Sequence, residues 1–277
     1  MKLNSTVKVF VDNELSRLNV SSKCLTLGII QIGSDAASSS YIRGKLSDCE
    51  KYGISTVYIH ESCKKWKNKR QVLSYIKELY NETLYNICNG VIVQLPLPYG
   101  ITSDEVSDII LPSYDVDGFN PSSSVVPCTA RGVTEFCNRV LFENDMSGVN
   151  AVVVGRSKTV GNPIAQQLLN KNASVTVFHS KSRDSDMRNA IKRCDLVVTC
   201  TNVVEDEVLS GMVYDSDCDV VDVGLGKGKD GKLHGNITQN VVDLIDDSSK
   251  RRIVSGTGGV GLLTRMALIK NLVDLNK

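Results

Sequence analysis

Ala151-Val-Val-Val-Gly-Arg-Ser-Lys-Thr-Val-Gly-Asn-Pro163 is the stretch that decides the fold. It predicts a buried strand, a tight Gly155-x-Ser157-x-x-x-Gly161 turn and a helix opened by Pro163. Free backbone N–H groups and the positive end of that helix can then face a phosphate. The pattern is a variant of the Rossmann fingerprint, and its place in a strand–helix–strand unit of about 30 residues favours nucleotide binding. The alternative is that the glycines only supply positive φ angles.

The choice of cofactor can be read at the end of the next predicted strand. Proteins that bind NAD place an Asp or Glu there to hold the ribose hydroxyl. This chain continues instead as Phe178-His179-Ser180-Lys181-Ser182-Arg183. Hydroxyls and cations at that point, together with Arg156 and Ser157, suit a ribose 2′-phosphate, so the sequence predicts NADP. The alternative is that Lys181 and Arg183 are solvated loop charges.

Along the rest of the chain, short β-branched runs alternate with segments of helical period, the pattern of parallel strands joined by crossover helices. The strands are expected at 25–32, 56–60, 90–95, 151–154, 174–178, 196–199, 220–223 and 253–254. Helices fall between them, including 70–80 and a last one at 262–276. Five of the six prolines lie from Pro96 to Pro127, where the chain is expected to divide. The predicted fold class is α/β with two domains.

Composition points to small-molecule ligands. The 277 residues carry 32 basic and 31 acidic side chains, so no global field favours nucleic acid or an anionic membrane. Nine scattered cysteines include no pair at zinc spacing, and the three histidines fall in no metal pattern, which predicts a reducing compartment and no metal. No run approaches the ~20 apolar residues of a membrane span, and Met1 to Leu18 does not read as a signal peptide. We expect a cytoplasmic protein.

Polar side chains suited to a substrate lie ahead of the glycine loop. Tyr41 and Lys45 are four residues apart on a predicted helix and therefore share one face. Gln94 ends a buried strand and Asp117 lies in a turn, where ligands of open α/β sheets collect. Taken singly, Gln94 could cap its strand, and Asp117 could form its own Asx-turn with Gly118. The Tyr-x-x-x-Lys pair also occurs in short-chain dehydrogenases, but there the glycine loop comes first, so the order excludes that family.

Together these segments resemble the bifunctional methylenetetrahydrofolate dehydrogenase/methenyltetrahydrofolate cyclohydrolase family, in the family's order and over nearly the whole chain. The matching stretches are Tyr41-x-x-x-Lys45, Tyr52-Gly-Ile54, Val93-Gln-Leu-Pro-Leu-Pro98, Asp115-Val-Asp-Gly118, Pro127-Cys-Thr-x-x-Gly-Val133, Val152-Val-Val-Gly-Arg-Ser-x-x-Val-Gly-x-Pro163, Asp222-Val-Gly224 and Gly258-Gly-Val-Gly261. Chance agreement at so many sites is negligible.

The resemblance implies a role for each matching residue. Lys45 would be the catalytic lysine, and Tyr41 the ring that stacks on the aminobenzoyl part of folate. Gln94 would orient and tune the lysine, and Asp117 would bind the pterin. The positions that match contacts to NADP are Gly155, Arg156, Ser157, Ser180 and Leu225.

The implied fold is two α/β domains with a cleft between them. The folate-binding catalytic domain would be 1–118, with a returning helix at 262–277, and the Rossmann NADP-binding domain would be 119–261. Members of the family are usually homodimers, which is the state expected here. The ligands implied are a folate substrate and NADP, with no nucleic acid, membrane or metal.

The implied reaction has two steps. Hydride loss from the methylene carbon leaves a cation delocalised over two folate nitrogens, so oxidation by NADP requires mainly alignment of that carbon with the nicotinamide. Hydrolysis of the methenyl product to formyltetrahydrofolate requires proton transfers, which an amine can perform only if its pKa is lowered by desolvation or nearby positive charge. The resemblance therefore assigns Lys45 chiefly to the hydrolysis.

Some positions depart from the family pattern. The chain has Thr257-Gly-Gly-Val-Gly-Leu-Leu-Thr264 where Pro-Gly-Gly-Val-Gly-Pro-Met-Thr is usual; Ala36 replaces another proline, and Ser47 stands where a basic residue is common. Loss of the prolines removes a restraint on the loop beside the folate and nicotinamide. One alternative is a monofunctional dehydrogenase of the same fold with slow hydrolysis. Another is a non-catalytic dinucleotide-binding protein, against which retention of all four polar substrate-site residues argues.

Overall fold

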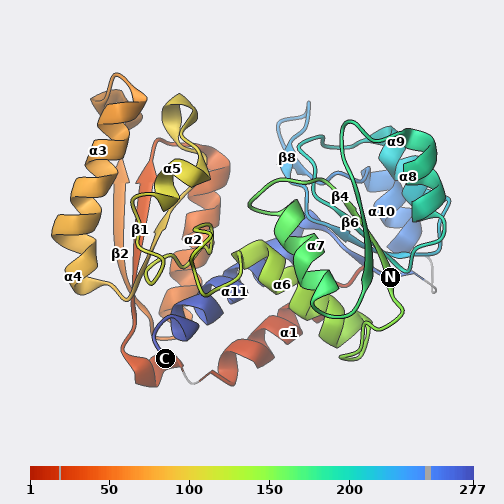
Figure 1. The fold of residues 1–277 in the computed structure, drawn as a ribbon, viewed down its shortest axis with the longest axis horizontal. Coiled ribbons are helices and arrows are strands. Elements are labelled where there is room, and N and C mark those ends of the chain that lie inside the picture. Colours follow the sequence, from red (N-terminus) through yellow and green to blue (C-terminus); the bar gives the residue numbers. More distant parts are fainter. Residues whose placement is uncertain (19, 247–250) are drawn as a thin grey trace. The chain divides into compact units, whose positions relative to one another are not determined.

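The computed structural model describes residues 1–18, 20–246 and 251–277 (Figure 1). The chain forms two compact units. The N-terminal unit consists of Asn13–Cys128 and Arg265–Lys277, and the C-terminal unit consists of Met1–Asp12 and Thr129–Thr264. The chain passes between the units inside three helices, which are α1 (Asn4–Ser16), α6 (Cys128–Phe136) and α11 (Gly261–Asp274).

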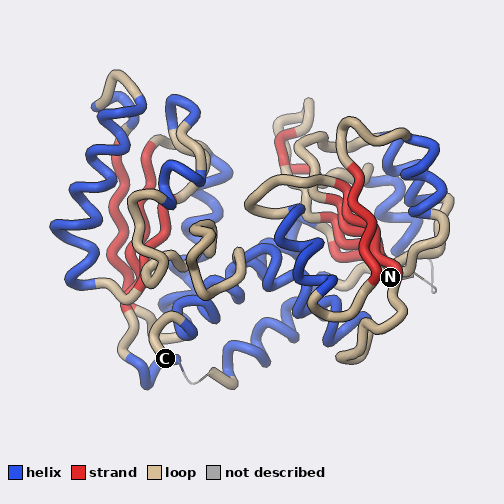
Figure 2. Tube along the Cα trace, in the orientation of Figure 1, coloured by secondary structure: helices blue, strands red, loops and turns tan. Residues whose placement is uncertain are grey.

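The N-terminal unit is built on a parallel sheet of order β2-β1-β3. Figure 2 draws its strands in red. Its strands are β1 (Thr26–Ile32), β2 (Ser55–Glu61) and β3 (Gly90–Val93), and its helices are α2 (Ala36–Lys51), α3 (Lys69–Leu79), α4 (Tyr85–Ile87) and α5 (Ser103–Ser107). The central strand β1 and its neighbour β3 are almost entirely buried, because both faces of the sheet are covered. Since the strands are parallel, the start of α2 after β1 and the residues after β3 share one edge of the sheet.

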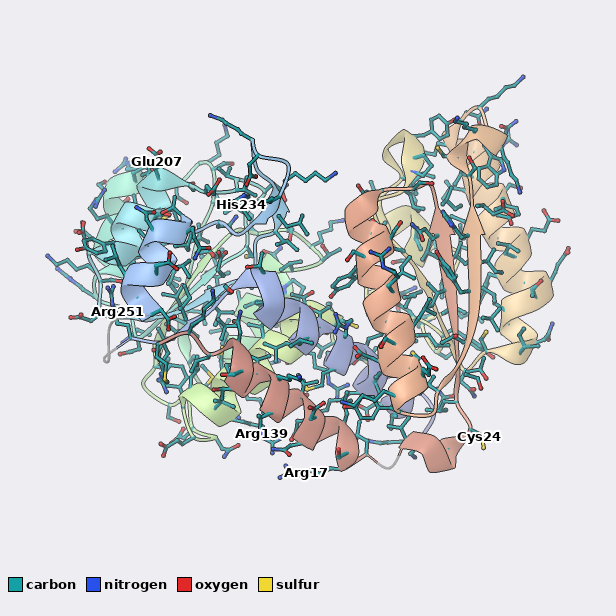
Figure 3. All side chains as sticks on the ribbon, turned by 180° about the vertical axis from the view of Figure 1, so that it is seen from behind. Arg17, Cys24, Arg139, Glu207, His234 and Arg251 are labelled. Carbon is teal, nitrogen blue, oxygen red and sulfur yellow. The ribbon has the colours of Figure 1, made fainter. Side chains whose placement is uncertain are left out.

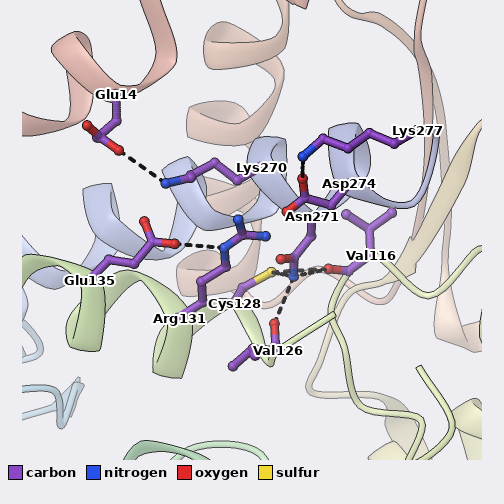
Figure 4. A network of polar contacts seen from close by, with 10 residues as sticks. All are labelled: Glu14, Val116, Val126, Cys128, Arg131, Glu135, Lys270, Asn271, Asp274 and Lys277. Carbon is purple, nitrogen blue, oxygen red and sulfur yellow. Dashed lines mark hydrogen bonds and ion pairs between the residues drawn. The ribbon is translucent and has the colours of Figure 1, made fainter. Parts of the chain in front are cut away.

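The helix α11 fixes the segment that follows β3. The fully buried side chain of Asn271 donates through Nδ2 to the carbonyl oxygens of Val116 and Val126, both at 2.9 Å (Figure 4). A buried amide requires such partners, and each carbonyl gains a donor in turn. One helix residue therefore holds the segment that contains Asp117 at two points, Val116 and Val126.

The C-terminal unit contains a second parallel sheet, of order β10-β7-β6-β4-β5. Its strands are β4 (Asn150–Val154), β5 (Ser174–Phe178), β6 (Leu196–Thr199), β7 (Asp219–Asp222) and β10 (Ile253–Val254); the helices are α7 (Gly161–Leu169), α8 (Asp184–Ile191), α9 (Glu207–Tyr214) and α10 (Gln239–Asp246), and a hairpin pairs β8 (Gly226–Lys227) with β9 (Leu233–His234). Counted along the chain, the sheet has the doubly wound order 2-1-3-4-5, which reverses between β4 and β6. Such sheets bind ligands beyond the carboxyl ends of the strands at that reversal.

The first residues of the chain belong with the C-terminal unit. Lys2 forms a parallel bridge to Ile253, and the Leu3 N–H donates to the Ile253 carbonyl at 2.8 Å. Phe10 of α1 packs edge-on against Phe136, with 5.4 Å between the ring centroids. These contacts lengthen the sheet at its β10 edge and cover one end of α6.

The predicted fold class is confirmed, because helices and parallel strands alternate in two α/β units. All eight predicted strands are present, each within two residues of its expected bounds. The helix expected to be opened by Pro163 begins two residues earlier, at Gly161. Within the described ranges, every helix falls short of the length and apolar character that crossing a bilayer requires.

The domain bounds predicted from the sequence differ from the compact units. The prediction of 1–118 with 262–277, and of 119–261, concerns which part binds folate and which binds NADP, and it stays a prediction. The units follow packing instead. Residues 119–128 pack with the N-terminal unit because Asn271 holds Val126, although they follow the predicted boundary.

Candidate active site

Tyr41 and Lys45 lie one turn apart on α2, as the spacing predicts. The Lys45 Nζ atom is 5.3 Å from the centroid of the Tyr41 ring, which is a cation–π contact. The same atom donates a hydrogen bond to Oε1 of Gln94 at 3.0 Å. Only 4% of Lys45 is exposed, so its amine is held by two named partners with little water around it.

The end of β3 sets the orientation of Gln94. Its backbone N–H donates to the Ile30 carbonyl at 2.9 Å, which continues the β1–β3 pairing. Its side-chain Nε2 donates to the Leu95 carbonyl at 2.7 Å, which leaves Oε1 for Lys45. The Leu95 carbonyl also accepts the Ser38 hydroxyl at 3.1 Å, in the first turn of α2. The helix that carries the lysine and the strand that carries the amide therefore meet at one carbonyl group.

Asp117 lies in the turn that Asn271 holds. Burial raises the pKa of the Asp117 carboxyl, and the positive charge of Lys45 opposes that rise. Among the residues that the structure describes, none donates a side-chain or backbone hydrogen bond to the Asp117 carboxylate. A partly buried carboxylate near a cation, with its acceptor atoms unused, is suited to N–H groups of a ligand.

The backbone N–H groups of this turn are bonded by Asp115, not by the Asx-turn considered for Asp117. The Asp115 carboxylate accepts the backbone N–H groups of Gly118 at 3.1 Å and Asn120 at 2.7 Å. Burial raises the pKa of Asp115 to about 6, and the nearby Asp117 charge adds to that rise. A cavity of about 10 Å³, lined by both carboxylates together with Leu95 and Phe119, adjoins the turn and has room for about one water. Sequence analysis missed this role, although Asp115 lies two residues before Asp117.

The glycine loop after β4 leaves no room for side chains at two positions. Gly155 has a φ of +127°, and a Cβ there would lie 2.4 Å from the carbonyl oxygen of Cys200, just after β6. A Cβ on Gly161 would lie 2.4 Å from the Gly155 carbonyl oxygen. Gly161 has no positive φ, so close approach of the backbone, not φ alone, requires that glycine. The loop thus lies at the reversal of the sheet, where ligands bind.

The predicted cofactor residues all follow carboxyl ends of strands in this sheet. Arg156 and Ser157 follow β4, Ser180 follows β5, and Leu225, 47% exposed, follows β7. Ser157 Oγ accepts the Gly161 N–H at 3.2 Å at the start of α7. In the described parts of the chain, the side chains of Arg156 and Ser180 make no hydrogen bond or ion pair with the protein. They are exposed and available to a ligand.

A buried polar network fixes the loops after β6 and β7. The Asp222 carboxylate accepts the Thr199 hydroxyl at 2.8 Å and the backbone N–H of Asn236 at 3.0 Å. The Asn236 side chain in turn accepts the Thr201 N–H at 3.0 Å. Sequence analysis quoted Asp222 only as part of a motif and did not identify Asn236, because its partners are distant in sequence. Close by, His234 in strand β9 of the hairpin lies between Glu205 at 3.2 Å and Asp230 at 2.9 Å (Figure 3).

The loop that lacks the family's prolines is held by hydrogen bonds. The Thr257 carbonyl accepts Asn4 Nδ2 at 3.0 Å and the Ser255 hydroxyl at 2.9 Å. Gly258 has a φ of +84°, which suits glycine. Residues 256–260 therefore have restraints of their own in place of the prolines.

In the described ranges, no three His, Cys, Asp or Glu side chains gather as metal ligands. None of the nine cysteines forms a disulfide.

The two parts of the chain match the two domain models of one protein family. The model of the tetrahydrofolate dehydrogenase/cyclohydrolase catalytic domain matches residues 1–117, and that of the corresponding NAD(P)-binding domain matches residues 127–277. The bifunctional protein FolD of Staphylococcus aureus is 33% identical over 280 residues, covering 96% of this chain and 91% of its own.

Solved structures of enzymes from the same group are similar to this chain. The bifunctional enzyme FolD, a methylenetetrahydrofolate dehydrogenase/cyclohydrolase from Campylobacter jejuni, has a TM-score of 0.75 and 30% identity, covering 99% of this chain and 95% of its own. A 5,10-methylenetetrahydrofolate dehydrogenase from the silkworm Bombyx mori has a TM-score of 0.79 and 26% identity, covering 97% and 95%.

Proposed function

Because the chain belongs to the tetrahydrofolate dehydrogenase/cyclohydrolase family, we propose that it oxidises methylenetetrahydrofolate with NADP and hydrolyses the methenyl product to formyltetrahydrofolate. The family and enzyme class predicted from the sequence motifs are confirmed by both domain matches. The observation that carries the residue-level proposal is the hydrogen bond from Lys45 to Gln94 beside the Tyr41 ring.

The oxidation needs alignment of the substrate more than proton transfer. The exposed part of the Tyr41 ring would stack on the aminobenzoyl group of folate. The Asp117 carboxylate, with unused acceptor atoms, would accept N–H groups of the pterin. Two contacts at different points of one rigid substrate fix its direction, which is what a hydride transfer requires.

The hydrolysis needs a group that moves protons at the methenyl carbon. Water adds to that carbon and gives up one proton, and the hydroxyl proton of the adduct then moves to a folate nitrogen as the bond from that nitrogen to the carbon breaks. We assign this role to Lys45, whose amine contacts both the Tyr41 ring and the Gln94 amide. The Gln94 bond would hold the amine in one direction during both proton transfers.

The C-terminal unit fits NADP. Gly155 and Gly161 are packed closely against neighbouring backbone, which holds the loop after β4 tight, and the positive end of α7 that follows it would face the pyrophosphate. Arg156 and the residues after β5 would hold the 2′-phosphate. NADP supplies the hydride acceptor, and the chain's part is to bind and align it. We assign NADP binding to 119–261 and the folate chemistry to 1–118 with 262–277.

A monofunctional dehydrogenase is the second candidate. The missing prolines of the 257–264 stretch favour it, because a looser loop would favour one activity over the other. The hydrogen bonds from Asn4 and Ser255 to Thr257 oppose it, since they restrain the same loop. The proposal of a non-catalytic binding protein has no observation in its favour.

We also propose that the protein is a cytoplasmic homodimer. Nine cysteines that form no disulfide support a reducing compartment. The dimer rests on the family resemblance alone. Sedimentation equilibrium that gives a single species of 30.2 kDa would refute it.

Two assays test the main proposal. The first follows methenyl absorbance with methylenetetrahydrofolate plus NADP, and then with NAD at matched concentrations. The second supplies purified methenyltetrahydrofolate without cofactor and follows its loss. We expect activity in both, with NADP preferred. Activity in the first alone would establish the monofunctional dehydrogenase, and activity in neither would refute both candidates.

A further inference from the structure

A closed turn follows β5, at the place where the sequence predicts recognition of the 2′-phosphate. The Ser182 N–H donates to the His179 carbonyl at 2.8 Å, so Ser180 and Lys181 are the two central residues of a β-turn. β5 pairs with β4, and the Gly155 N–H donates to the Phe178 carbonyl at 2.8 Å. The turn therefore begins directly beside the glycine loop.

Two side chains close the turn from inside. Ser182 Oγ accepts the His179 N–H at 3.0 Å, and His179 Nδ1 accepts the Lys181 N–H at 3.2 Å. Both side chains are half-buried. Three hydrogen bonds thus fix a turn of only four residues, and two of them come from side chains that face the protein.

The turn carries exposed positive side chains that form no ion pair with the described residues. Ser180, Lys181 and Arg183 are exposed, and their side chains make no hydrogen bond or ion pair with any residue that the structure describes. The acidic residues nearby, Asp184 and Asp186, lie in the first turn of α8, where they favour the helix end. An anion that meets the turn would therefore find unpaired donors on its outer side.

We propose that Ser182, acting with His179, is a specificity-determining positioning residue that holds the β5 turn in the form that selects NADP over NAD. The inference rests on the proposed NADP-dependent activity and deepens it. A charged phosphate gains strong hydrogen bonds from donors held in fixed places, whereas a free ribose hydroxyl gains less from the same cations. Loss of the internal bonds would free the turn, so that binding the 2′-phosphate would require ordering it again.

The test is Ser182→Ala, with initial rates measured against NADP and against NAD. We expect KM for NADP to rise about fivefold to tenfold, the effect of losing one hydrogen bond and orphaning its donor. KM for NAD should change by less than about twofold, and kcat at saturating NADP should be unchanged, because no reacting atom is touched. Ser182→Thr keeps the hydroxyl and should restore the wild-type KM.

Ser185→Ala is the matched control, because its hydroxyl contacts only Asp186 at 3.4 Å. His179→Phe removes the acceptor of the Lys181 N–H and should also raise KM for NADP. This second variant tests the inference even if Ser182→Ala does not fold. Equal changes of KM for both cofactors, or no change, would overturn the inference while leaving the proposed function intact. A wild-type enzyme that prefers NAD would instead refute the proposed cofactor.

Discussion

Lys45 Nζ and Gln94 Oε1 are 3.0 Å apart, although the two residues are separated by 49 positions in the sequence. The Gln94 Nε2 atom donates to the Leu95 carbonyl, and this bond turns Oε1 toward Lys45, from which it accepts a hydrogen bond. A buried ammonium without a partner would be strongly unfavourable, so this bond both satisfies the lysine and directs it.

Replacing the lysine tests its role in hydrolysis. In Lys45→Met, a side chain of similar length fills the site but moves no protons. We expect the cyclohydrolase rate to fall by about 10² or more, with the Kd for NADP unchanged, because the cofactor residues lie in the other unit. The loss of methenyl absorbance in the absence of cofactor measures the cyclohydrolase rate. Fluorescence titration measures the Kd for NADP.

Lys69→Met is the matched control, since Lys69 forms only a surface pair with Glu105. Unchanged hydrolysis in Lys45→Met would remove the lysine from the mechanism.

Replacing the amide tests the direction of the lysine. Gln94→Leu keeps the size of the side chain and removes the acceptor of the Lys45 bond. We expect kcat for hydrolysis to fall about tenfold to a hundredfold, because the amine loses a charge-assisted hydrogen bond. Gln166→Leu on α7, whose amide is exposed and bonds Asn170, is the control. If the two variants hydrolysed equally fast, Gln94 would have no part in catalysis.

Asp115 gives stability an unusual pH dependence. Its pKa in the folded protein is raised to about 6 from 3.8, so the folded state binds the proton more tightly than the unfolded state. The contribution of this carboxyl is therefore greatest below the unfolded value and is lost as pH rises through about 6. At about 1.4 kcal/mol per pKa unit, the free energy of unfolding relative to Asp115→Asn should fall by ~3 kcal/mol from pH 3.5 to pH 7.

Urea unfolding of both proteins across that pH range measures the difference. Asp145→Asn should show a change of opposite sign, because hydrogen bonds from Ser147 lower the pKa of Asp145. A difference between wild type and Asp115→Asn that stays constant with pH would contradict the raised pKa.

Gly155 tests the cofactor loop. In Gly155→Ala, the new Cβ would lie 2.4 Å from the Cys200 carbonyl at a φ that L residues rarely adopt. The backbone must move, so we expect NADP affinity, measured by calorimetry, to fall at least about tenfold. Gly211→Ala in α9 meets no atom within 4 Å and should leave affinity unchanged. Wild-type affinity in Gly155→Ala would refute the loop as the pyrophosphate site.

The sequence by itself determined the local features. Runs of β-branched and apolar residues predicted eight of the strands, although not β8 and β9. The signal is strongest for the central strands, which are buried on both faces of a parallel sheet. The four-residue spacing of Tyr41 and Lys45 placed them on one helix face, since 3.6 residues make a turn. The glycine loop also followed from its position between a strand and a helix.

Only the tertiary structure decided which distant groups meet. It pairs Lys45 with Gln94, bonds the Gly118 N–H to Asp115 instead of Asp117, and closes the β5 turn with Ser182. Dihedral preferences and periodicity act over a few residues, whereas these partners depend on which strands become neighbours and on which acceptor is left free. The neighbours are set by the sheet orders β2-β1-β3 and β10-β7-β6-β4-β5, which arise from packing of the whole chain.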